Sequence, residues 1–207
     1  DQEAQRNLLA AKEAEQQTLL NNTRGDEAAY KTLSSQSNAR KDQLQQEQQA
    51  AIERAMRAAN SGGGGGGAVA GDPNKGGYPA NLANSNYYNP VVDPWGMYSR
   101  QCVSYTAWKV YQKNGFMPYW GGVGNANQWP GNARKAGIPV SSTPRAGSVG
   151  VIMAGQYGHV VWVESVNANG TINISQYNYF NAGGAGWGHY SEMPNVSPSA
   201  YDYYIHF

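Results

Sequence analysis

A single cysteine, Cys102, is the strongest candidate nucleophile in the sequence because it lies at the start of a predicted helix. Residues 99–111 repeat apolar side chains at i, i+4 and i+7, the spacing of one buried helical face, and Gly115 is a natural helix stop. With Ser99 as the N-cap, Cys102 falls in the first turn. The free N–H groups and the positive dipole end there favour a thiolate and can hold a developing oxyanion. The alternative is a small cysteine packed inertly beneath the helix.

A histidine, His159, begins a predicted strand farther along the chain. The runs 160–166 and 171–178 flank residues 167–170, whose Asn and Gly content favours a β-hairpin. Residues 148–153 supply a third strand. The hairpin therefore decides which residues stand beside His159.

Two registers of this hairpin are compatible with the sequence. With a four-residue loop, the numbers of paired residues sum to 337, and His159 stands opposite Asn178 and diagonal to Gln176. With a two-residue turn at 169–170, His159 is diagonal to Asn178. Both place an amide beside the imidazole, which must accept the thiol proton on one nitrogen while a polar acceptor holds the other. We predict Cys102 as nucleophile and His159 as base, with Asn178 or Gln176 orienting the imidazole.

Residues 1–60 differ in composition from the remainder of the chain. They contain no Pro, one Gly and one aromatic residue, and they are rich in Ala, Gln, Glu and Leu, which favours a helix. Leucines 11 residues apart keep one stripe of a nearly straight coil. We predict a helical, coiled-coil regulatory segment, broken or kinked at residues 21–26 because of Gly25 and an N-cap candidate. Its thin apolar stripe requires packing on another chain, on an upstream helix or on the C-terminal domain.

A tract of six glycines begins at Gly62 and marks a predicted domain boundary. Residues 61–77 are interpreted as a Gly-rich flexible linker. Residues 78–207 hold nearly all the aromatic residues and are numerous enough to bury a core of their own. We expect this segment to be the catalytic domain.

Charge and composition exclude several classes of partner. Eight basic against nine acidic residues in 1–60, and seven against five in 61–207, leave no basic field, so no nucleic-acid partner is expected. No stretch approaches the roughly 20 apolar residues that span a bilayer, so the chain is predicted not to be membrane-spanning. Three His and one Cys show no metal-ligand spacing, so neither a metal nor another cofactor is expected. The chain begins at Asp1 rather than Met, as expected of a processed or truncated product.

Residues 93–108, with the sequence DPWGMYSRQCVSYTAW, resemble the nucleophile block of CHAP domains, the cysteine, histidine-dependent amidohydrolase/peptidase family. Four later blocks resemble the family's successive motifs in order: NANQW at 125–129, PRAGSV at 144–149, GHVVWVE at 158–164 and ISQYN at 174–178. Several ordered motifs at compatible spacing form a specific signal. The resemblance covers roughly residues 78–207.

This resemblance implies an α+β, papain-like fold with the Cys102 helix packed on an antiparallel sheet. It also implies secretion, association with the cell wall, and cleavage of peptide or N-acetylmuramoyl-L-alanine amide bonds in peptidoglycan, with Trp129 as a substrate-binding residue. The N-terminal helices resemble the coiled-coil regions of secreted cell-wall hydrolases. Gln176 departs from the Glu of many members; an amide fixes the imidazole tautomer but does not stabilise imidazolium with a full charge.

Three functional hypotheses follow for the sequence. The first is a cysteine hydrolase of peptidoglycan, an endopeptidase or amidase, whose N-terminal helices bind a protein partner, self-associate or inhibit the site. The second is a noncatalytic cell-wall-binding or scaffold protein that retains the fold. The third is a coiled-coil assembly factor with a passive globular domain.

Overall fold

The computed structural model describes residues 2–59, 67–179 and 187–207, with side chains described from residue 12 onward within these ranges. Contacts between residues group the chain into two compact units, Asp1–Leu44 and Gln45–Phe207. The division falls inside a helix and earlier than the expected boundary at residue 60. The C-terminal end of this helix therefore belongs to the unit that carries the candidate site.

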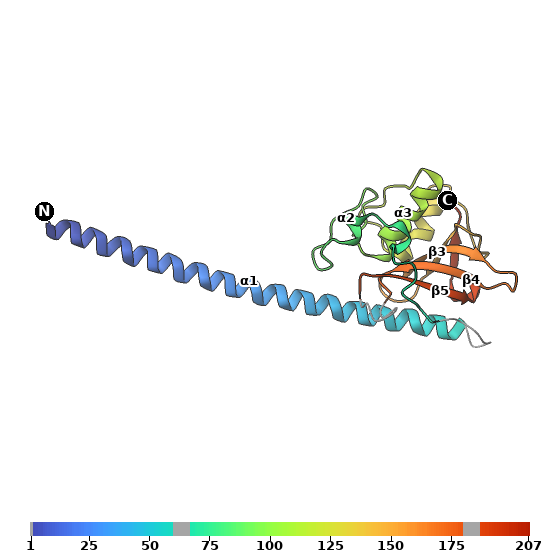
Figure 1. Cartoon of the computed structure of the whole chain (residues 1–207), viewed down its shortest axis with the longest axis horizontal. Coiled ribbons are helices and arrows are strands. Elements are labelled where there is room, and N and C mark those ends of the chain that lie inside the picture. The colour runs from blue at the N-terminus through green and yellow to red at the C-terminus, as the bar shows by residue number, and fades with distance from the viewer. Residues whose placement is uncertain (1, 60–66, 180–186) are drawn as a thin grey trace. The chain divides into compact units, whose positions relative to one another are not determined.

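Helix α1 runs without interruption over Gln2–Ala59 (Figure 1). The predicted break at residues 21–26 is therefore wrong. A single glycine, Gly25, costs an exposed helix only about 1 kcal/mol relative to Ala. The neighbouring side chains favour helix, and Lys31 makes an i,i+4 ion pair with Glu27 at 2.7 Å. One glycine among good helix formers is too small a penalty to end the helix.

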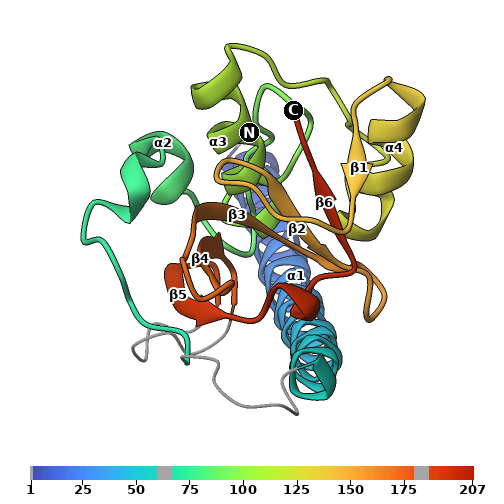
Figure 2. The ribbon, with the colours of Figure 1, turned by 90° about the vertical axis from the view of Figure 1, so that its right-hand side faces the viewer.

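Six antiparallel strands form one sheet in the order β1-β6-β2-β3-β4-β5 (Figure 2). The strands are β1 (Val140–Ser141), β2 (Val149–Ile152), β3 (His159–Val166), β4 (Ile172–Tyr177), β5 (Tyr190–Val196) and β6 (Tyr203–Ile205). The short helices of this unit are α2 (Ala80–Ala83), α3 (Cys102–Asn114) and α4 (Trp129–Lys135), with 3₁₀ turns at Lys75–Gly77, Ala126–Gln128 and Pro198–Ala200. The predicted α+β class is confirmed.

Two hydrophobic cores lie on the two faces of the sheet. Val160 and Trp162 of β3 pack with the buried face of α3. Val161 and Val163, which alternate with them, pack with residues from the end of α1. The residues of α1 in this second core are Ile52 and Met56, with 3% and 6% of their surface exposed. The segment Gln45–Ala59 is thus a layer of the fold.

The hairpin of β3 and β4 has the predicted register in the half nearer His159, but its last pair is Val166 with Ile172, so the loop is the five residues 167–171 and not the four predicted. Trp162 pairs with Ser175 and Val163 with Ile174, so paired numbers sum to 337. The register shifts by one residue beyond Val163, at a bulge away from His159. The first of the two registers considered from the sequence is therefore confirmed near the histidine.

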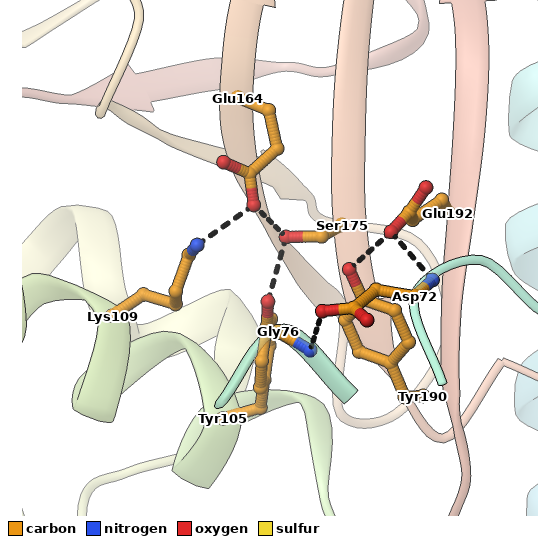
Figure 3. Close-up of polar contacts among 8 residues, drawn as sticks. All are labelled: Asp72, Gly76, Tyr105, Lys109, Glu164, Ser175, Tyr190 and Glu192. Atoms are coloured by element: carbon orange, nitrogen blue, oxygen red, sulfur yellow. Dashed lines mark hydrogen bonds and ion pairs between the residues drawn. The ribbon is translucent and has the colours of Figure 1, made fainter. Parts of the chain in front are cut away.

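The predicted linker at 61–77 lies partly outside the described residues, up to residue 66. Its remaining part contacts β5. Val69 forms a backbone bridge with Glu192, whose Oε1 accepts hydrogen bonds from the Asp72 N–H at 3.0 Å and the Tyr190 hydroxyl at 2.6 Å (Figure 3). The Asp72 carboxylate in turn accepts from the Gly76 N–H. Residues 69–76 are therefore attached to the edge of the sheet.

Candidate functional site

Cys102 is the first residue of α3. The N-cap is Gln101, in an extended conformation, and the helix ends at Gly115 in the left-handed conformation with φ of 68°. Ser99 is not the cap, contrary to the sequence prediction, because its Oγ accepts a hydrogen bond from the Val91 N–H at 3.1 Å in the preceding loop. The predicted position of Cys102 in the first turn is confirmed.

Burial controls the protonation of Cys102. Removal of the sulfur from water raises its pKa to about 11, and the backbone N–H groups of Val160, Val103 and Cys102 lower it by a smaller amount. The helix start thus acts in the predicted direction, but desolvation outweighs it. Cys102 is a neutral thiol in this structure. Its sulfur interacts with the backbone N–H of Val160, the residue directly after His159.

His159 begins β3 and is buried, with 3% of its surface exposed. Its Nε2 lies 2.8 Å from Gln176 Oε1. Because an amide oxygen only accepts, Nε2 carries the proton and Nδ1 keeps the lone pair that a general base requires. Burial lowers the pKa of His159 to about 4, against the opposing effect of Gln176. Among the described side chains, no hydrogen bond joins the imidazole to Cys102.

Gly158 makes the tight turn that starts the His159 strand. Its φ is 71°, and a Cβ built on it would lie 2.6 Å from Asn127 N and 2.8 Å from the Ile152 carbonyl oxygen. Both are backbone atoms of neighbouring segments. A side chain at residue 158 would therefore displace His159.

Asn178 contacts other groups than the imidazole. Its Oδ1 accepts from the Gly188 N–H at 2.6 Å, and its Nδ2 donates to Gln101 Oε1 at 2.7 Å and Gln45 Oε1 at 3.2 Å. The strand β4 ends at Tyr177, and Asn178 has a left-handed φ of 57°, which turns its side chain out of the strand alternation. Of the two amides predicted beside His159, the structure brings Gln176 to the ring.

Trp129 is fully buried, with 0% of its surface exposed. Its Nε1–H donates to the Gly124 carbonyl at 3.0 Å, and its ring packs edge-on against Trp120 at 5.1 Å. A side chain without exposed surface has no face on which a sugar can stack. Trp129 is therefore a core residue in this structure, contrary to the substrate-binding role that the resemblance implies.

Residues 92–178 match the family model of the CHAP domain. This segment is a CHAP domain. It contains Cys102, His159, Gln176 and Asn178, and the match ends at Asn178, one residue after β4.

Part of the chain is similar to staphylococcal proteins that are named as a secretory antigen and as an N-acetylmuramoyl-L-alanine amidase. The staphylococcal secretory antigen ssaA2 of Staphylococcus aureus is 43% identical over 81 residues, 39% of this chain and 28% of that protein. The N-acetylmuramoyl-L-alanine amidase sle1 of Staphylococcus haemolyticus is 35% identical over 118 residues, 54% of this chain and 34% of that protein. A crystal structure of an N-acetylmuramoyl-L-alanine amidase from Staphylococcus aureus matches with a TM-score of 0.46 and 30% identity, covering 57% of this chain and 33% of that one. The alignments span about a third of these relatives.

The end of α1 lies against the loop before His159. Packing on the C-terminal domain was one of the three alternatives for this helix, but no residue pattern indicated this loop. Gln48 Nε2 donates to the carbonyls of Ala154 at 2.8 Å and Gly158 at 3.1 Å, and its Oε1 accepts from the Tyr157 N–H at 3.1 Å. Gln48 is buried, with 7% of its surface exposed. Polar glutamines in a Gln-rich helix carry no signal for burial, so only the three-dimensional contacts distinguish this one.

A second polar cluster of the C-terminal unit lies between α3 and the sheet (Figure 3). Glu164 accepts from Lys109 at 2.8 Å and from Ser175 at 2.6 Å, and the Ser175 hydroxyl is 2.8 Å from that of Tyr105. These groups satisfy one another, as in a structural network. Across the described parts of the chain, no three His, Cys, Asp or Glu side chains are grouped to hold a metal ion. None of the described helices is long and apolar enough to cross a membrane.

His159 makes the stability of the CHAP domain depend on pH. Its pKa falls from 6.5 in a free chain to about 4 on folding, so between these values the unfolded chain binds a proton that the native protein does not. The free energy of unfolding therefore rises from pH 4 to 6.5 and is level above. We expect acidification from pH 7 to 4 to cost up to about 3 kcal/mol through this group. Urea unfolding at several pH values will measure the slope, and an equal slope in His159→Asn would contradict the assignment.

Proposed function

We propose that the chain is a peptidoglycan hydrolase that cleaves an amide bond of the bacterial cell wall by a cysteine–histidine mechanism. One observation carries the proposal: in a CHAP domain with Cys102 at the start of α3, Gln176 Oε1 fixes His159 with Nδ1 free to act as a base. Relatives named as an amidase and as a probable autolysin support the substrate class. Their names, and that of a secretory antigen, support a secreted, extracellular protein associated with the cell wall.

In the proposed reaction, His159 Nδ1 takes the thiol proton as the sulfur of Cys102 attacks the amide carbonyl carbon. The C–N bond then breaks, and the imidazolium gives its proton to the leaving amine. Water hydrolyses the resulting thioester, releasing a carboxylic acid and restoring the thiol. The chemistry needs no cofactor or metal.

Two donors are proposed for the oxyanion of this reaction. The first is the backbone N–H of Cys102 at the helix start. The second is Nε2 of Gln101, the residue before the nucleophile. Asn178 Nδ2 holds Gln101 Oε1 at 2.7 Å, which leaves Nε2 as the available end of that amide. Asn178 then acts on the reaction through Gln101.

Mass spectrometry of purified peptidoglycan treated with the protein tests this function. Hydrolysis creates a new amine and a new carboxylate in the soluble fragments. Cleavage within the stem peptide identifies an endopeptidase, and separation of the stem peptide from N-acetylmuramic acid identifies an N-acetylmuramoyl-L-alanine amidase. Fragments without new amines would refute the proposal.

The second candidate function is a noncatalytic cell-wall-binding or scaffold protein. The neutral Cys102 thiol, with its pKa raised to about 11, and the uncharged Gln176 beside His159 favour it. This reading expects sedimentation of the protein with cell walls and no released amine. It also expects no rapid labelling of Cys102 by iodoacetamide at neutral pH.

We also propose that Gln45–Ala59 restrains the site. Gln48 bonds to the Gly158 carbonyl beside His159, and Gln45 accepts from Asn178. The burial that keeps Cys102 neutral and lowers the pKa of His159 supports a resting state in this structure. The exposed apolar side chains of residues 12–44 support binding of a protein partner or self-association there; they include Leu19, Leu20, Tyr30 and Leu33.

Loss of both glutamine contacts is expected to release this restraint. In Gln45→Ala/Gln48→Ala, iodoacetamide labelling of Cys102 and wall hydrolysis should each rise about threefold or more, since about 0.7 kcal/mol of weakened docking gives that factor. Gln17→Ala, an exposed change in the first unit, is the matched control. Unchanged labelling and hydrolysis in the double variant would remove the regulatory role.

A further inference from the structure

The Gln176 amide forms a hydrogen bond through its oxygen but not, among the described residues, through its nitrogen. Gln176 is buried, with 1% of its surface exposed, and its Oε1 accepts from His159 at 2.8 Å. Its Nε2, which carries two donor hydrogens, is also buried and has no hydrogen-bond partner among the described residues. A buried amide nitrogen without an acceptor is costly, so the position of Gln176 requires a further polar neighbour.

Ser191 stands directly opposite Gln176 in the ladder of β4 and β5. Its side chain is fully buried, and its Oγ likewise has no partner in the described structure. Residues opposed across an antiparallel pair extend to the same face of the sheet, with Cβ atoms about 5 Å apart. A hydroxyl with two free lone pairs thus faces the same space as an amide with two free hydrogens.

We propose that Ser191 is a positioning residue for the hydrolase, whose hydroxyl, joined to Gln176 Nε2 by one buried water, holds the amide that orients His159. The inference rests on the proposed function. Ordered buried waters typically link such otherwise unsatisfied polar groups. Ser191 does not touch substrate or the reacting atoms, and it acts through Gln176.

This contact matters because the Gln176 amide has two unlike ends. With Oε1 toward the ring, His159 holds a proton on Nε2 and can accept another on Nδ1. A displaced or turned amide would present N–H groups to Nε2, which would move the ring proton to Nδ1. The imidazole would then lose the lone pair that receives the thiol proton.

A double-mutant cycle between Ser191→Ala and Gln176→Met separates positioning from packing. Ser191→Ala in the natural background is expected to lower kcat about 10-fold, as outer-shell changes do, with KM altered less than twofold. Nitrogen-15 NMR at neutral pH should show His159 changing from the Nε2–H tautomer to a mixture. In the Gln176→Met background, where the amide is absent, Ser191→Ala should change neither quantity further.

Ser191→Thr keeps the hydroxyl and should retain both kcat and the tautomer, while thermal unfolding of each variant verifies the fold. An equal effect of Ser191→Ala in both backgrounds would reduce Ser191 to a packing role and overturn the inference. If the unaltered protein releases no amines from cell walls, the proposed function falls separately. The tautomer in Ser191→Ala still decides the inference, and an unchanged Nε2–H form refutes it.

Discussion

Cys102→Ala should lower the release of amines from peptidoglycan by at least about 1000-fold, the scale seen when a covalent nucleophile is removed. Cys102 is the only cysteine in the sequence and lies at the start of α3, so its removal leaves no second thiol to act as nucleophile. Steady-state hydrolysis of purified walls, measured beside the unaltered protein, gives the ratio.

The control for this variant is wall binding. Alanine differs from cysteine only by the loss of the sulfur, so Cys102→Ala should keep its melting temperature within a few degrees and sediment with cell walls as before. Equal hydrolysis by both proteins would refute the cysteine mechanism. Equal binding without hydrolysis by either would favour the noncatalytic reading.

Two truncations are expected to behave very differently although they differ by only the last part of α1. Removal of residues 1–44 takes away the first compact unit and should leave the melting temperature nearly unchanged. Removal of 1–59 also takes Ile52 and Met56 out of the second core, at about 2–5 kcal/mol for each buried side chain. It also strips the hydrogen bonds that Gln48 makes with the loop before His159. The melting temperature should fall by about 10 °C or more.

Differential scanning calorimetry of the two truncated proteins measures this difference. Point variants provide the matched comparison: Ile52→Ala should be destabilised, whereas Leu33→Ala, whose side chain is 65% exposed, should not. Equal melting temperatures for the two truncations would show that Gln45–Ala59 is dispensable to the fold. The segment could then be removed to test its regulatory role without destabilising the domain.

Local patterns in the sequence predicted the parts of the site that neighbouring residues determine. Apolar spacing and Gly115 define the Cys102 helix, and the turn at 167–170 defines the strand that starts at His159. Strand alternation then identified the amides beside the ring, and the structure selects Gln176 because Asn178 leaves the strand with a left-handed φ. The Asn178 side chain instead bonds to Gly188 and Gln101, which lie 10 and 77 positions away in the sequence.

Other properties depend on tertiary burial and were not predictable from local patterns. The pKa of Cys102 rises because the folded protein excludes water from the sulfur, whereas the sequence revealed only the helix start that acts in the opposite direction. Trp129 looks like a loop aromatic in sequence but is fully buried. Similarly, nothing in the spacing of Gln48 distinguishes it from the many exposed glutamines of the same helix.

The turn at Gly158 has a consequence for how variants of this protein can diverge. Selection for wall cleavage would retain Cys102 and His159 for their chemistry. It would retain glycine at residue 158 for steric reasons, because backbone atoms of two other segments occupy the place of a side chain. A library randomised at that codon should therefore return glycine almost exclusively. The position of the base, His159, thus depends on Gly158, a residue that has no side chain and takes no part in the chemistry.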